Sequence, residues 1–154
     1  SAAKYLADAD LIFCLDYNDF SRTGEMKTSL ASSSAFKIMI DHHPDPSKET
    51  DVLVSSINEC ATAQMIFQFI VTMGWQDKLS SKAAECIYCG IMTDTGSFRF
   101  PSTSAKTHQI VSELLNTGMS NTFVHNNVFD NDSESRVSRV GFSNSEKNKV
   151  IPDF

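Results

Sequence analysis

The stretch Phe36–His43, which reads FKIMIDHH, is an apolar run that ends in one acid and two histidines. A run that is apolar at nearly every position, rather than at alternate positions, is typical of a parallel strand buried on both faces. Leu11–Leu15 (LIFCL) has the same pattern and is followed by Asp16. Because parallel strands end at the same edge of a sheet, we expect Asp16 to lie beside the acid and the histidines that end the other strand.

Helices are predicted to alternate with strands along the chain. A third apolar stretch, with β-branched residues, covers Val52–Ile57, and most of the later segments have helical periodicity. The expected helices are Ala2–Ala9, Gly24–Ser34, Ala61–Met73, one that begins after Ser80 or Ser81, and Ser102–Asn116. This alternation predicts an α/β fold with a parallel sheet flanked by helices. We expect residues 1–128 to form the folded domain, and residues 129–154 a helical or polar linker with a helix at Arg136–Gly141.

Charge and composition limit the classes of partner. The net charge of −6 and the lack of a basic stripe argue against long nucleic acid, because phosphate neutralisation supplies most of that affinity. An acidic protein can still bind a small phosphorylated ligand where metal ions and a few arginines supply local positive charge. No apolar run approaches the length of a membrane span, so no membrane partner is expected. Four cysteines without a disulfide framework favour reduced thiols and a cytoplasmic location.

Cys86 and Cys89 have the spacing of a redox or zinc pair, with two residues between them. A zinc site would need two further ligands at suitable spacing, and the other two cysteines are isolated in the sequence. We therefore interpret the pair as two buried thiols on one face of a helix.

A third chemical element is Gly90–Phe100, which reads GIMTDTGSFRF. Asp94 ends an apolar helix face, and the small residues that follow it let backbone approach a ligand closely. Arg99 then offers a planar guanidinium for phosphate. Carboxylates and imidazoles without a thiolate suit manganese or magnesium better than a structural zinc site.

The order of these motifs resembles a known family. Asp41-His42-His43-Pro44 is similar to the motif that names the DHH phosphoesterases, and Asp16 resembles the single aspartate of the preceding family motif. Thr93–Phe100 is similar to the last motif of the branch that contains bacterial nanoRNases and 3′-phosphoadenosine 5′-phosphate phosphatases. The resemblance runs from Tyr5 to about Gly141. It implies a Rossmann-like DHH domain, with residues 1–128 as part of a manganese-dependent catalytic domain.

The resemblance also implies a set of metal ligands. Asp16 would bridge two manganese ions, for which magnesium could substitute, and His42 and Asp94 would bind one of them. Asp41 would orient His42 and raise its basicity. On the substrate side, His43 would contact the phosphate or assist proton transfer, and Arg99 would hold a substrate phosphate.

The sequence departs from the family pattern in three places. The first family motif, with a histidine and two aspartates, is expected upstream of Ser1, and the C-terminal DHHA1 domain is expected beyond this chain. The third departure is Gln64, which stands where many relatives carry a glutamate. Arg22 lies in a loop, and we expect it to be solvated rather than functional. We therefore expect the 154-residue chain alone to be nearly inactive and to bind manganese weakly.

The favoured function is hydrolysis of short oligonucleotides, and of 3′-phosphoadenosine 5′-phosphate to a nucleoside 5′-monophosphate. Cyclic dinucleotide phosphodiesterase, pyrophosphatase and single-strand exonuclease activities are alternatives within the same superfamily. A second class of function is a non-catalytic module, a fragment or degenerate copy that binds a nucleotide without turning it over. A homodimer is compatible with each of these functions.

Overall fold

The computed structural model describes residues 2–130 of a chain that divides into two compact units, residues 1–119 and residues 120–154. In the second unit, the described residues form helix α6 (Asn121–His125) and a π-helical turn, η3 (Asn126–Asp130). The predicted helix at Arg136–Gly141 lies outside the described residues. The predicted domain boundary at residue 128 stays a prediction.

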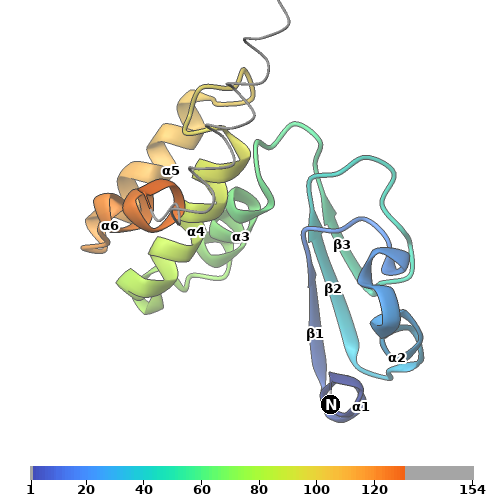
Figure 1. The fold of residues 1–154 in the computed structure, drawn as a ribbon. Helices are drawn as coiled ribbons and strands as arrows, with labels where there is room; N and C mark the ends of the chain where they lie inside the picture. The colour runs from blue at the N-terminus through green and yellow to red at the C-terminus, as the bar shows by residue number, and fades with distance from the viewer. Residues whose placement is uncertain (1, 131–154) are drawn as a thin grey trace, which may run out of the picture. The chain divides into compact units, whose positions relative to one another are not determined.

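The first unit contains a three-stranded parallel sheet (Figure 1). Its strands are β1 (Leu11–Leu15), β2 (Phe36–Asp41) and β3 (Val52–Ser55), in the order β1-β2-β3. In this register Leu15 pairs with Ile40 and Asp41 pairs with Ser55, so all three strands end at one edge. The predicted α/β fold with a parallel sheet is confirmed.

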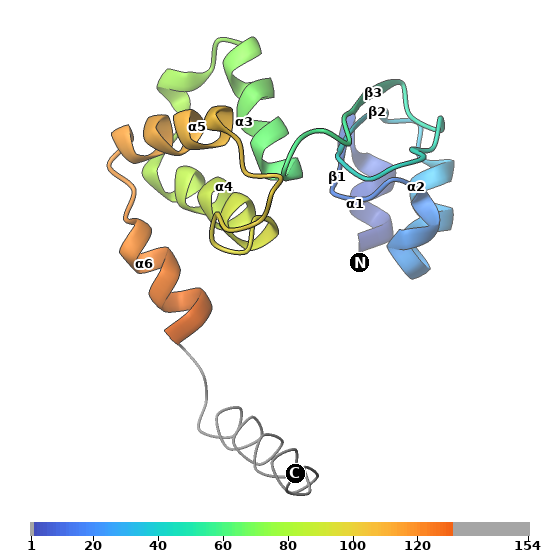
Figure 2. The same cartoon turned by 90° about the horizontal axis from the view of Figure 1, so that it is seen from above.

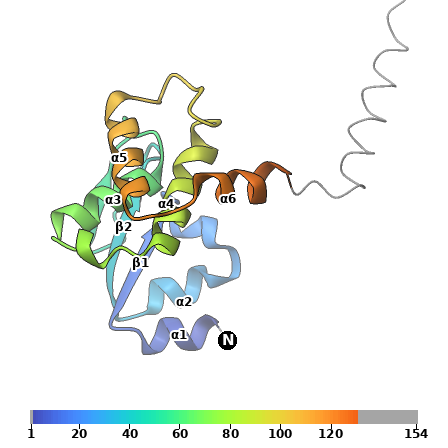
Figure 3. The same ribbon diagram turned by 90° about the vertical axis from the view of Figure 1, so that its left-hand side faces the viewer.

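One face of the sheet packs against the N-terminal helices, α1 (Ala2–Asp8) and α2 (Lys27–Ser32) (Figure 1 and Figure 3). A 3₁₀ segment, η1 (Phe20–Met26), precedes α2. The predicted helix at Gly24–Ser34 is therefore shorter than expected, because Gly24 has a φ of 59° and interrupts the helix. The core on this face consists of Cys14, Phe20, Leu30 and Met39, with Leu6, Ile12 and Tyr17 packed against it.

The prediction that the strands are buried on both faces is wrong for β1 and β3, and it is confirmed for the carboxyl end of β2, where the successive residues Met39 and Ile40 are both buried. Leu11, Phe13 and Leu15 project to the opposite face of β1 and are 38–47 % exposed, and every residue of β3 is exposed. Only part of this face is packed, as where Phe13 meets the ring of Phe69 edge-on at 5.8 Å between centroids. A continuous apolar run indicates that both faces of a strand can be buried, but burial also requires other helices or strands that pack on each face.

The remaining helices of this unit pack on one another (Figure 2). They are α3 (Thr62–Thr72), α4 (Ser81–Asp94) and α5 (Ala105–Asn116), with a 3₁₀ turn, η2 (Gln76–Lys78), between the first two. The Ser80 hydroxyl accepts from the amide of Ala83 and caps α4, as predicted. Within residues 2–130, no helix has both the length and the apolar character that a membrane span requires.

The two cysteines of α4 are not both buried, which corrects the sequence prediction. Cys86 is exposed and Cys89 is half-buried. Since successive residues of a helix turn by about 100°, Cys86 lies opposite the face of α4 that packs inward. That face carries Ala84, Ile87, Tyr88 and Ile91.

Candidate metal centre

Asp16 lies directly beyond β1, at the edge where the strands end. Its backbone is left-handed, with a φ of 65°, and its amide donates to the carbonyl of Ile40 at 3.2 Å. This conformation is less stable by roughly 1–2 kcal/mol for a residue other than glycine, and residues that adopt it are frequent at functional sites. The turn leaves the Asp16 carboxylate 58 % exposed at the edge of the sheet.

His42 follows β2 and lies between two carboxylates. Its Nε2 is 3.8 Å from Oδ1 of Asp16 and 4.0 Å from Oδ2 of Asp94. Its Nδ1 is 3.3 Å from the carbonyl oxygen of Glu59, a contact that the sequence did not predict. A carbonyl can only accept, so this contact makes Nδ1 the donor and leaves Nε2 as the ring nitrogen that faces the two carboxylates. The three residues expected to bind metal are therefore brought together.

Asp94 is the last residue of α4, and its position is electrostatically unfavourable. The C-terminus of a helix carries partial negative charge, which disfavours a carboxylate there. Burial raises the pKa of Asp94, the nearby Asp16 carboxylate raises it further, and His42 and His43 only partly oppose this. Two acids held together at a helix C-terminus are what a bound cation would stabilise.

Asp41 binds the second histidine of the motif rather than the first. Its carboxylate is fully buried, accepts from the backbone amide of His43 at 3.1 Å and lies 2.7 Å from Nδ1 of the same residue. The expectation that Asp41 orients His42 is therefore wrong. An aspartate readily accepts from the amide two residues further on, and this local turn brings the ring of His43 to it.

Three side chains form a group that could hold a divalent ion. One potential ligand atom from each of Asp16, His42 and His43 lies within 4.8 Å of the others. The two imidazole rings meet edge-on at 4.7 Å between centroids. The resemblance gave His43 contact with the phosphate or a part in proton transfer, and this group adds it as a potential metal ligand. Oxygen and imidazole donors without a thiol fit manganese or magnesium.

The loop after Asp94 is held by Thr95, whose side chain is fully buried. Its hydroxyl donates to the carbonyl of Ile91 at 2.7 Å and accepts from the amide of Phe98 at 3.1 Å. The three residues 96–98 all have positive φ, between 56° and 64°. Arg99 is exposed, and its Nε donates to the carbonyl of Gly96 at 2.7 Å. Its role in binding phosphate stays a prediction.

Comparison with known proteins identifies a family model and several curated relatives that this chain resembles. The model of the DHH family, N-terminal domain, matches residues 1–91. The bifunctional oligoribonuclease and PAP phosphatase NrnA of Bacillus subtilis is 36 % identical over 101 residues, which cover 64 % of this chain and 32 % of the relative. A probable NrnA of Streptococcus mutans is 41 % identical over 80 residues, 52 % of this chain and 25 % of the relative.

A solved structure shows the same fold. An exopolyphosphatase-related protein from Bacteroides fragilis superposes with a TM-score of 0.90 at 38 % identity, and the match covers 94 % of this chain and 42 % of that one. The match to the NrnA of Bacillus subtilis covers about a third of the length of that relative. The family match extends over more than half of the chain and includes both Asp16 and the Asp41-His42-His43 motif. This chain belongs to the DHH family.

Proposed function

We propose that the protein is a metal-dependent phosphoesterase that uses the centre described above. The observation that carries the proposal is the convergence of Asp16, His42 and His43 within 4.8 Å, with Asp94 4.0 Å from His42. Manganese is the proposed ion, and it would be held by these carboxylate oxygens and imidazole nitrogens. A divalent ion supplies Lewis acidity and positive charge for phosphoryl chemistry.

The protein's own groups would position the reacting atoms and the protons. The buried Asp41 carboxylate accepts from Nδ1 of His43, so in the neutral ring the lone pair lies on the other nitrogen, Nε2. That nitrogen can bind the ion or take a proton from a reacting group. Arg99, which follows the Thr95 loop, is proposed to hold a substrate phosphate by charge-assisted hydrogen bonds.

The proposed substrates are short oligonucleotides and 3′-phosphoadenosine 5′-phosphate, hydrolysed to nucleoside 5′-monophosphates. The names of the Bacillus subtilis and Streptococcus mutans relatives support this choice. The net charge of −6 favours small phosphorylated substrates over long nucleic acid. The free cysteines are consistent with a reducing compartment, and we propose the cytoplasm.

The proposal is tested on full-length protein that has been stripped of metal with a chelator. Adding Mn²⁺ should start the release of nucleoside 5′-monophosphate from a dinucleotide, and His42→Ala should abolish it. Absence of hydrolysis with Mn²⁺, Mg²⁺ or Co²⁺, in a protein that binds the ion, would favour a non-catalytic nucleotide-binding module instead.

Hydrolysis of inorganic polyphosphate is a second candidate, supported by the resemblance to the exopolyphosphatase-related structure. Polyphosphate would present a phosphoanhydride bond to the centre and the dinucleotide a phosphodiester bond, and only the nucleotide offers a base and a sugar. A higher kcat/KM for the release of phosphate from polyphosphate than for the release of nucleoside 5′-monophosphate from the dinucleotide would decide for this second function.

A further inference from the structure

Glu59 lies in the turn between β3 and α3, and the backbone of this turn contacts the candidate metal centre. Its carbonyl oxygen is 3.3 Å from Nδ1 of His42. At the other end of the turn, the amide of Ser56 donates to the carbonyl of Asp41 at 3.2 Å. The amide of Glu59 donates to the carbonyl of Ser56 at 3.3 Å, which closes the turn. The position of the Glu59 carbonyl therefore determines how the ring of His42 is oriented.

The side chain of Glu59 is held by three donors from two helices. Lys106 Nζ of α5 lies 2.6 Å from Oε1, and the side-chain amides of Gln64 and Gln68 of α3 both donate to Oε2, the latter at 3.2 Å. Burial pushes the pKa of Glu59 upward, but the bonds from these donors outweigh it and hold the pKa below its usual value. Glu59 is therefore charged, and both of its oxygens are occupied by strong bonds.

Gln64 shows why an amide stands where the family pattern has an acid. Its side chain is 1 % exposed, its nitrogen donates to Glu59, and its oxygen lies 3.1 Å from the donating thiol of Cys60. A glutamate at this position would place a second buried carboxylate against Glu59, and like charges at that distance repel. The amide thus fits a turn in which Glu59 carries the charge.

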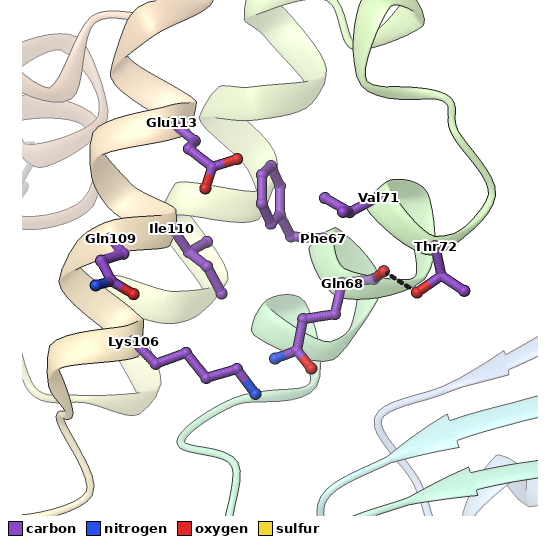
Figure 4. A pocket seen from close by; sticks show the side chains of 8 residues that line it. All are labelled: Phe67, Gln68, Val71, Thr72, Lys106, Gln109, Ile110 and Glu113. Carbon is purple, nitrogen blue, oxygen red and sulfur yellow. Dashed lines mark hydrogen bonds between the residues drawn. The ribbon is translucent and has the colours of Figure 1, made fainter.

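Lys106 and Gln68 reach Glu59 from opposite sides of a groove between α3 and α5. The groove has a volume of about 370 Å³ and includes Phe67 and Ile110 in its lining. Figure 4 shows Lys106 and Gln68 extending toward the same end of this groove. Glu113 also lines it, but within residues 2–130 it makes no ion pair. Glu113 is therefore a matched control for Glu59.

We propose that Glu59 is a positioning residue for His42. Its side chain, held by three donors, fixes the backbone carbonyl that accepts from Nδ1 of His42, so that Nε2 is the ring nitrogen that faces the ion. The proposal rests on the proposed function only in taking His42 as a metal ligand. Histidine ligands commonly donate their other N–H to a carbonyl or a carboxylate, and loss of such a partner costs about 10–100-fold in metal affinity.

The first test reads the tautomer of His42 without metal. Full-length protein labelled with ¹⁵N-histidine is studied by long-range ¹H–¹⁵N correlation at about pH 8, where an ordinary imidazole is neutral. The signals of His42 are assigned with a His42→Asn variant. We expect the proton on Nδ1 alone in the wild type, and a mixture of tautomers in Glu59→Ala. A wild-type His42 that carries its proton on Nε2 would overturn the proposal.

The second test is a Mn²⁺ titration of the same proteins. Glu59→Ala keeps the carbonyl but releases the turn that holds it, so binding should weaken by about 10-fold, the lower end of the loss seen when the partner is removed. Glu59→Gln should lose less, because an amide oxygen still accepts from Gln64 and Gln68, and Glu113→Ala should bind as the wild type does. Lys106→Met removes one exposed donor and should give the smallest loss, and it replaces Glu59→Ala if that variant does not fold. Unchanged Mn²⁺ affinity and tautomer in Glu59→Ala and Glu59→Gln would contradict the proposal.

These outcomes are independent of the substrate. A protein that shows the predicted tautomer and the graded Mn²⁺ affinities, yet hydrolyses no phosphoester, would refute the proposed function and leave the role of Glu59 intact. Conversely, hydrolysis with unchanged Mn²⁺ affinity in Glu59→Ala would refute the positioning role alone.

Discussion

At the scale of single residues, the Asp41–His43 pair makes a direct prediction. Asp41→Asn replaces a carboxylate that accepts from Nδ1 of His43 by an amide that can donate to it, so the ring is driven toward the other tautomer. We expect turnover to fall ~100-fold or more, as wrong-tautomer substitutions do in other enzymes, with little change in KM.

The same pair allows a test of coupling. If Asp41 acts only through His43, then Asp41→Asn combined with His43→Ala should be no slower than His43→Ala alone, because residues that work as a unit are not additive. Steady-state kinetics at fixed Mn²⁺ and salt measure this. Losses that multiply in the double variant would show that Asp41 acts by another route.

Asp94 provides a test by pH. Its raised pKa means that the folded protein binds this proton more tightly than the unfolded chain does. Ionising Asp94 therefore lowers the free energy of unfolding. This loss is absent below the ordinary pKa of 3.8, grows as the pH rises toward the raised pKa, and is complete above the raised pKa. We expect Asp94→Asn to raise the Tm of metal-free protein at about pH 7 and to lose this advantage at about pH 3.

Calorimetry with a chelator present measures this difference. Asp77→Asn, which changes an exposed acid of η2, is the control and should show no such pH-dependent gain. With saturating Mn²⁺ the order should reverse, since the wild type gains stability from the ion that the variant binds less well. A metal-free Asp94→Asn variant less stable than the wild type at neutral pH would contradict the electrostatic account.

At the scale of elements, the crossing of α3 and α4 carries Asp94 to the sheet edge. A Cβ added to Gly90 would lie 2.7 Å from the Cβ of Ala63, so the two helices approach as closely as a glycine permits. Gly90→Ala should gain ~1 kcal/mol of helix propensity but lose ~1–3 kcal/mol by overpacking. We expect a net loss of about 1 kcal/mol, measured by urea unfolding.

Replacing the other residue of this contact should reverse the effect. In the double variant, Ala63→Gly restores the space that Gly90→Ala fills, and the unfolding free energy should recover beyond the sum of the single changes. A single Gly90→Ala variant that is more stable by the full propensity value would mean that the helices do not meet there.

Much of the fold could be predicted because the periodicity of apolar residues reports local structure directly. The ends of β1 and β2 placed Asp16 and His42 correctly, and the Ser80 cap located the start of α4. The predictions failed where packing between distant segments decides the result. The exposed face of β1 is one example, and the exposure of Cys86 on α4 is another.

At the scale of the whole molecule, the site depends on contacts that no local pattern encodes. Glu59 and Lys106 are 47 residues apart, and nothing in either segment indicates that they meet. The choice of His43 over His42 as the partner of Asp41 follows from the turn beyond β2, which strand periodicity does not describe. Residue types at element ends predict that the centre binds a metal ion, and the orientation of its side chains comes from tertiary structure.

The central claim is that Asp16, His42, His43 and Asp94 form one divalent-metal centre. The most direct test is anomalous X-ray scattering at the manganese edge from crystals of the full-length protein grown with Mn²⁺. We predict a strong peak about 2.0–2.3 Å from a carboxylate oxygen of Asp16 and from Nε2 of His42. A fully occupied manganese peak elsewhere in the protein, with none between these side chains, would contradict the claim.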